Sequence, residues 1–145
     1  MSKSLKTLIK ISKSEVDRLQ KELAQLIKNQ DLYKSHIEIF KQNIAHERNM
    51  ANENFENPEI ALAFVNFANA TNDKIDIAQA EVDKLETEIA AKRDVLRDAF
   101  SEQKKFEIVD AANAERRRLE INKFEDNKLD EIGTSMFVRS GKNEQ

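Results

Sequence analysis

Apolar residues recur at alternating steps of four and three through the first third of the chain. This stepping begins at Leu5 and visits fourteen positions, of which eleven are apolar. The positions are Leu5, Ile9, Ser12, Val16, Leu19, Leu23, Leu26, Gln30, Tyr33, Ile37, Phe40, Ile44, Glu47 and Ala51. Because steps averaging about 3.5 residues define a left-handed supercoil, the pattern predicts one coiled-coil helix over residues 3–51.

A second apolar run predicts another helix over residues 58–132. Its positions are Ile60, Phe64, Phe67, Thr71, Ile75, Ala78, Val82, Leu85, Ile89, Lys92, Leu96 and Ala99. Two consecutive steps of four, from Phe67 to Thr71 to Ile75, predict a local unwinding of the supercoil.

The segment between the two runs predicts a short loop over residues 52–57. Asn57, Pro58 and Glu59 form a helix start, with an N-cap, a proline in the first turn and an acidic residue near the positive end of the helix dipole. Gly133 is suited to a C-terminal cap, which leaves a loose basic tail over 133–145. A loop this short favours an antiparallel hairpin, so we expect one elongated all-α domain over residues 1–145.

The predicted helices differ in length, which leaves part of the second one without a partner. Folding the chain about residue 54 would place Lys3 near residue 105 and leave 106–132 uncovered. The apolar residues of that stretch follow no single heptad: Phe106, Val109, Leu119, Ile121, Phe124, Leu129 and Ile132. We therefore expect this segment to bind a partner protein.

Composition supports an all-helical chain. The sequence holds two Gly, one Pro and no Cys among 145 residues, with a net charge of −3. Sandwich, barrel and βαβ folds need frequent turns that Gly and Pro supply, so these folds are excluded. Without cysteine there is no disulfide framework and no thiolate metal site. Neither an apolar run of membrane-spanning length nor a signal sequence is present, so we expect a cytoplasmic protein.

No group of residues resembles an active site, and we expect no enzyme activity, catalytic residue, cofactor or metal. His36 and His46 do not lie in a Glu-x-x-His pair, and a phosphate-binding loop would need glycines. The acidic pairs of the second helix are more simply explained as solvated faces.

Three features have both a structural and a functional interpretation. The aromatic set Tyr33, Phe40, Phe55, Phe64 and Phe67 either fills the loop end of the hairpin or docks a protein. The band of residues 116–118 is either a solvated face or a partner-binding surface; nucleic acid is disfavoured because acids interleave it. The lysine-rich start either packs in the hairpin or touches anionic lipid.

Several segments together resemble one protein family. Residues 4–10 read Ser-Leu-Lys-Thr-Leu-Ile-Lys and lead into Glu-Val-Asp at 15–17, while Glu-Arg-Arg-Arg-Leu-Glu at 115–120 precedes Asn-Lys-Leu-Asp-Glu-Ile at 127–132. In this order, over nearly the whole chain, they resemble the FliJ family of bacterial flagellar type III export proteins.

The resemblance implies a non-enzymatic export component that serves flagellum biogenesis and motility. Members form an antiparallel two-helix coiled coil similar to the central stalk of rotary ATPases. They bind the pore of the hexameric export ATPase, promote its assembly and activity, contact the cytoplasmic domain of the export gate and handle empty export chaperones. It thus implies a monomeric hairpin in the cytoplasm, peripheral at the inner face of the cell membrane.

Two residue sets carry these implied contacts. The ATPase-ring contact would consist of Arg116, Arg117, Arg118, Lys123, Lys128, Asp130 and Glu131. The export-gate contact would consist of Tyr33, Ile37, Phe40, Ile44, Phe64 and Phe67. In the second set, Ile44 departs from the family pattern, which has an aromatic residue there.

Three alternatives remain open at the level of the sequence. A rotary ATPase stalk subunit is disfavoured because it carries an α/β insertion between its helices, whereas only a short loop is predicted here. A generic coiled-coil scaffold or holding chaperone would dimerise through the same seam. A protein held electrostatically at a membrane surface is the third.

Overall fold

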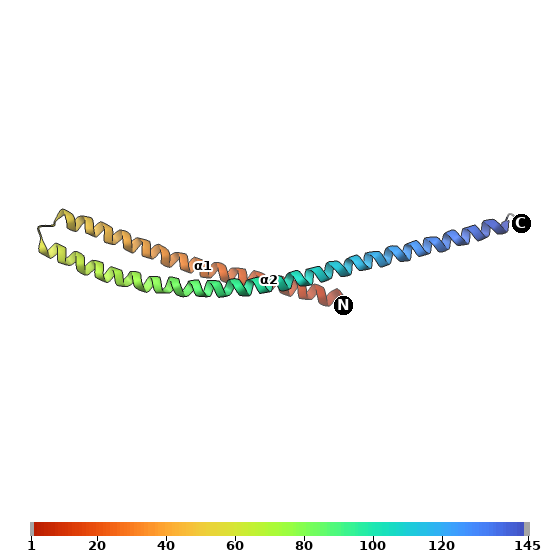
Figure 1. The fold of residues 1–145 in the computed structure, drawn as a ribbon, viewed down its shortest axis with the longest axis horizontal. Helices are drawn as coiled ribbons and strands as arrows, with labels where there is room; N and C mark the ends of the chain where they lie inside the picture. The colour runs from red at the N-terminus through yellow and green to blue at the C-terminus, as the bar shows by residue number, and fades with distance from the viewer. Residues whose placement is uncertain (1, 144–145) are drawn as a thin grey trace. The chain divides into compact units, whose positions relative to one another are not determined.

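The computed structural model describes residues 2–143, which form two α-helices joined by a short turn (Figure 1). Helix α1 spans Ser2–Glu53 and helix α2 spans Pro58–Asn143. Within the described residues there is no strand, and the predicted all-α helical hairpin is confirmed. Neither helix contains an apolar stretch that could span a membrane, over the same residues.

The chain divides into two compact units. The hairpin unit is Ser14–Ala99, and the terminal unit combines Met1–Lys13 with Phe100–Gln145. Each unit contains part of α1 and part of α2, so in both of them the two helices contribute to the packing.

The turn of the hairpin unit is closed by asparagine side chains and backbone rather than by glycine. The Asn54 N–H donates to the Ala51 carbonyl oxygen at 3.1 Å, and the Asn57 N–H donates to the Asn54 oxygen at 3.0 Å. The Asn54 side-chain amide also donates to the Met50 oxygen at 3.0 Å, which satisfies a carbonyl at the end of α1. Because no residue in 2–143 has a positive φ, this turn does not require Gly.

Helix α2 begins as the sequence predicts. The Glu59 N–H donates to the Asn57 side-chain oxygen at 3.0 Å, and the Ala61 N–H donates to the Asn57 carbonyl oxygen at 3.2 Å. Pro58 occupies the first helical position, where its missing N–H costs nothing. The predicted N-cap is therefore confirmed.

The predicted end of α2 at Gly133 is wrong. The helix continues through Gly133 and Gly141 to Asn143, and neither glycine has a positive φ. A C-terminal cap requires the left-handed conformation, whereas a helical glycine costs only about 1 kcal/mol relative to alanine. The predicted loose tail is thus helical as far as residue 143, and residues 144–145 lie outside the described part.

The heptad positions of α1 form one side of the hairpin core, as predicted. In the hairpin unit every one of them, from Val16 to Ala51, is buried or half-buried. The most deeply buried apolar side chains come from both helices: Val16, Leu19, Ile37, Ile44, Ala78, Val82, Leu85 and Ile89. An amphipathic helix is marginally stable alone in water, so this shared seam holds the unit together.

The predicted unwinding between Phe67 and Ile75 is wrong. Phe67 is 38% exposed, and the half-buried Ala68 takes the seam position between Phe64 and Thr71. The two consecutive steps of four lie nearer the turn, from Ile60 to Phe64 to Ala68. From Ala68 onward, steps of three and four alternate along the seam. The small Ala68 side chain fits between closely packed helices, whereas the ring of Phe67 lies at the edge of the seam.

Polar contacts across the seam set its register. Gln30 is buried, and its amide donates to the Val82 carbonyl oxygen at 3.3 Å and to a Glu86 carboxylate oxygen at 2.6 Å. Lys92 forms an ion pair with Glu22 at 2.7 Å. A polar residue in an apolar seam favours the one alignment that satisfies it. As residue numbers rise along α1 their partners fall along α2, so the helices are antiparallel.

The hairpin folds about Asn57 rather than about residue 54. Glu22 and Lys92 are equally distant from Asn57 in the sequence. In the terminal unit, too, more of α2 is covered than predicted, because Phe106, Asp110 and Asn113 are half-buried there. The expectation that α2 is uncovered from residue 106 onward is therefore wrong.

Two isoleucines of α2 test the seam directly. Ile89 is 2% exposed and Ile77 is 69% exposed. Replacing Ile89 by Ala removes buried methyl groups and leaves a cavity, so we expect a loss of about 2–5 kcal/mol in the free energy of unfolding. Ile77→Ala is the matched control and should change it by less than about 0.5 kcal/mol. Urea unfolding followed by circular dichroism measures both; equal losses would contradict the assigned seam.

The Glu22–Lys92 pair predicts a pH dependence. The hydrogen bond from Lys92 lowers the pKa of Glu22 below its ordinary value of 4.5, and Arg18 adds to this. A lowered folded-state pKa gives stability that is present above pH 4.5 and is lost as the pH falls through the folded pKa. Glu22→Gln should therefore lower Tm at neutral pH, and the difference from the natural chain should shrink in acid.

Glu38→Gln provides the control for this experiment. Glu38 is exposed on the same helix and has no ion-pair partner among residues 4–141. Its variant should follow the natural chain at every pH. If Glu22→Gln lowers Tm by the same amount at neutral and acidic pH, the Glu22–Lys92 pair does not stabilise the protein through its charges.

Candidate functional site

The end of α2 is an exposed helical surface. Every residue from 114 to 141 is exposed. Eight large apolar side chains are among them: Leu119, Ile121, Phe124, Leu129, Ile132, Met136, Phe137 and Val138. A helix with apolar residues on its exposed surface is typical of a protein-interaction site, and this segment is the principal candidate.

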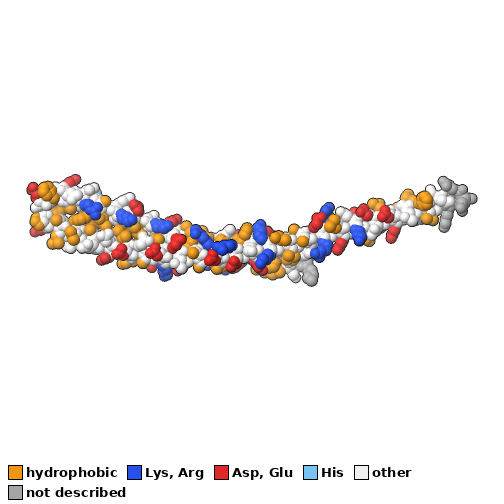
Figure 2. All heavy atoms as spheres, viewed as in Figure 1, with side chains coloured by type: hydrophobic (Ala, Val, Ile, Leu, Met, Phe, Trp, Pro, Cys, Tyr) orange, Lys and Arg blue, Asp and Glu red, His pale blue; other side chains and the backbone are white. Residues whose placement is uncertain are grey.

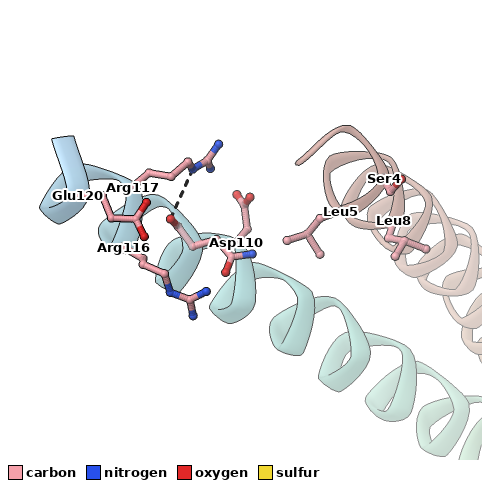
Figure 3. A pocket seen from close by; sticks show the side chains of 8 residues that line it. Ser4, Leu5, Leu8, Asp110, Arg116, Arg117 and Glu120 are labelled. Atoms are coloured by element: carbon pink, nitrogen blue, oxygen red, sulfur yellow. Dashed lines mark hydrogen bonds between the residues drawn. The ribbon is translucent and has the colours of Figure 1, made fainter. Parts of the chain in front are cut away.

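A groove lies where the covered part of α2 gives way to this exposed end (Figure 3). Ser4, Leu5 and Leu8 of α1 form one wall. The other wall belongs to α2 and consists of Asp110, Asn113, Arg116, Arg117 and Glu120. Figure 3 shows the two walls facing each other across an open space, with charged groups only on the α2 side.

The three predicted arginines of this segment have different surroundings. Arg118 donates two hydrogen bonds to the Glu115 carboxylate, at 3.1 and 2.6 Å, and this pairing lowers the pKa of Glu115. The Arg117 Nε–H donates to the Asn113 carbonyl oxygen at 3.4 Å. Arg116 lines the groove and has no hydrogen-bond partner among residues 4–141. Of the three, Arg116 is therefore the most available to another molecule.

The remaining residues of the predicted ATPase contact are spread along the exposed helix. Lys123, Lys128, Asp130 and Glu131 are all exposed. The Lys128 ammonium lies 5.9 Å from the centre of the Phe124 ring, so it covers part of one apolar side chain. These residues share one helix but no enclosed pocket, which suits contact with an extended protein surface.

The predicted export-gate residues lie in different environments. Ile37 and Ile44 are 6% and 8% exposed, in the seam between the helices. Tyr33 packs against the cluster of Ile37, Ala78 and Val82. These three side chains stabilise the hairpin, so a partner could reach Ile37 and Ile44 only by separating the helices.

Phe64 and Phe67 instead line a groove beside the turn. Its other residues are Glu47, Met50, Ala51, Asn54, Ile60 and Ala63. The Arg48 guanidinium lies 5.8 Å from the centre of the Phe64 ring. Around the turn, shown at the left of Figure 2, hydrophobic side chains reach the surface. The heptad pattern does not predict Met50, because this residue lies off the seam; only its position close to the turn could have indicated it.

The histidines are not placed as metal ligands. The His36 ring meets the Tyr33 ring edge-on, with centroids 6.3 Å apart. In the part of the chain that the structure describes, no three His, Cys, Asp or Glu side chains are grouped so as to hold a metal ion.

These features define a helical hairpin protein that offers helix surfaces for binding other proteins. A family model described as the flagellar FliJ protein matches residues 1–142. The chain belongs to the FliJ family, as its sequence resemblance predicted. No curated protein and no solved structure matches it.

Membership of this family makes the chain a component of the flagellar export apparatus that interacts with other export proteins. The family is one of non-catalytic components, which agrees with a surface made of the sides of helices.

Proposed function

We propose that the chain acts as a central stalk of the flagellar export apparatus. In this proposal residues 114–141 of α2 bind and stimulate the hexameric export ATPase, and the surface beside the turn contacts the cytoplasmic domain of the export gate. The main observation in support of this function is that every α2 residue from 114 to 141 is exposed. The protein is a monomeric hairpin when so engaged, lies in the cytoplasm, and associates with the inner face of the membrane through its partners. It also helps to recycle export chaperones.

The mixed chemistry of the α2 end supports an asymmetric contact inside a ring. Its charged residues include both signs, and its apolar residues lie on several sides of the helix. A single helix inside a ring presents a different side to each ATPase subunit. Arg116, which is free to form a new ion pair, and Lys123 lie seven residues apart on the same side of the helix and contribute to binding there, while Lys128 contributes on another side.

The surface beside the turn supports the proposed gate contact. Phe67 is exposed and Phe64 half-exposed in the groove at the turn, and aromatic side chains often dominate protein interfaces. The half-buried Tyr33 and Phe40 lie farther along the hairpin. We therefore propose that Phe64 and Phe67 make the gate contact, and that Ile37 and Ile44 support it by holding the helices together.

Replacing Arg116, Arg117 and Arg118 together by Ala should weaken stimulation of the export ATPase by about tenfold or more, because charged contacts at protein interfaces commonly contribute that much. All three are exposed, so helicity by circular dichroism should be unchanged. Hydrolysis by the ATPase, measured against increasing amounts of each variant, tests this.

The double variant Arg93→Ala/Arg97→Ala is the control, since it removes exposed arginines of the same helix within the hairpin unit. It should stimulate like the natural chain. Unchanged stimulation by the triple variant would remove the arginine band from the proposed mechanism.

For the gate contact, Phe67→Ala should weaken binding to the cytoplasmic domain of the export gate by about tenfold, as expected of an aromatic contact residue. Because Phe67 lies at the edge of the seam, Tm should change little. Leu62→Ala is the matched control: Leu62 is exposed on α2 and does not line the groove. Calorimetry measures binding; equal effects of the two substitutions would argue against a contact at this groove.

A further inference from the structure

The end of α2 carries an apolar stripe that is distinct from the seam facing α1. Its positions recur at steps of three and four, and six of the eight are apolar: Ala111, Ala114, Arg118, Ile121, Glu125, Leu129, Ile132 and Met136. All eight are exposed, and the four large apolar side chains are 51–66% exposed. A stripe with this period on a helix is typical of a coiled-coil contact with another helix.

The two charged residues in the stripe identify the partner. Arg118 and Glu125 lie on the same side of the helix, and an unpaired charge in an apolar interface is unfavourable. If a second α2 lies antiparallel to the first, Arg118 of one copy is opposite Glu125 of the other. Two-fold symmetry then repeats the pair, so Glu125, which has no ion-pair partner among residues 4–141, gains one, and Arg118, already bonded to Glu115 of its own helix, gains a second.

Side-chain sizes are complementary in the same alignment. Leu129 of one copy lies opposite Ala114 of the other, and Ile132 lies opposite Ala111. A large side chain that meets a small one allows the two helices to pack closely. The stripe is therefore complementary to itself when reversed at Ala111, Ala114, Leu129 and Ile132, whereas Ile121 lies opposite Asn122 at the centre and Met136 lies opposite Glu107.

A shift of five residues gives a second candidate alignment, in which Arg118 lies opposite Asp130 and so again meets an opposite charge. In this shifted alignment no residue of the stripe lies opposite another residue of the stripe; Ile132, for example, lies opposite Arg116. The alignment that pairs Arg118 with Glu125 instead keeps the two apolar stripes facing each other.

We propose that two copies of the chain associate through this stripe, as an antiparallel pair of α2 ends whose two-fold axis passes close to Ile121 and Asn122. The pair covers Arg118 and Ile121, so a chain in this state cannot offer the same surface to the export ATPase. That consequence rests on the proposed function, whereas the association itself does not.

Charge reversal tests the association with the full chain. Sedimentation equilibrium of the natural protein should show monomer and dimer in exchange. Arg118→Glu and Glu125→Arg should each weaken self-association by about tenfold or more, because each creates two like-charge contacts per dimer. An equimolar mixture of the two variants should associate again, since every altered contact then joins opposite charges.

Arg116→Glu is the control, because its position faces the uncharged Asn127 in the proposed alignment; it should associate like the natural chain, and circular dichroism should show equal helicity for all variants. A natural chain that remains monomeric at millimolar concentration would overturn the proposal. So would a mixture that associates no better than its separate components.

Cysteine cross-linking tests the alignment, since the chain has no native cysteine. A mixture of Ala114→Cys and Leu129→Cys should form disulfide-linked dimers faster than either variant alone, because the two positions are opposite each other only between different copies. Phe137→Cys, exposed but outside the stripe, should link slowly. Rapid linking of Phe124→Cys to itself, at the centre of the shifted alignment, would overturn the proposed one.

Discussion

Residues 14–99 are held together by a seam of side chains that neither helix could remove from water alone. Isolated helices are marginally stable, and this protein has no sheet, disulfide or second layer among its described residues to support them. Leu19 and Ile89 are nearly inaccessible only because α1 and α2 return along each other. The surfaces that the helices offer to other proteins are the side chains that this seam does not bury.

Register gives the seam its specificity. Apolar side chains alone tolerate several alignments, but the buried Gln30 amide finds its acceptors at Val82 and Glu86 in only one of them. The Glu22–Lys92 ion pair is compatible with the same alignment. In the terminal unit, described separately, the last half-buried residue of α2 is Asn113, and residues 114–141 are exposed.

The exposed end of α2 explains how a protein built from the sides of two helices can have a specific function. Its apolar residues and its charges of both signs form surfaces that remain uncovered in one chain. A ring-shaped ATPase and a second copy are both chemically suitable occupants, since each would supply helix or loop surfaces and opposite charges. The two proposed partners would use overlapping residues, so self-association would leave fewer chains available to the ATPase as the protein concentration rises.

The sequence by itself determined the helices, the start of α2 at Asn57 and Pro58, and the family, because these depend on local spacing and on short motifs. Only the tertiary structure decided that Ala68 rather than Phe67 lies in the seam, that the hairpin folds about Asn57, and that α2 continues past Gly133. It also decided that Ile37 and Ile44, predicted as contact residues, are buried in the core. Spacing along one helix indicates which face is apolar, but burial depends on the alignment of two helices. That alignment is a joint property of side-chain sizes, Gln30 and the turn, which the pattern of one helix does not contain.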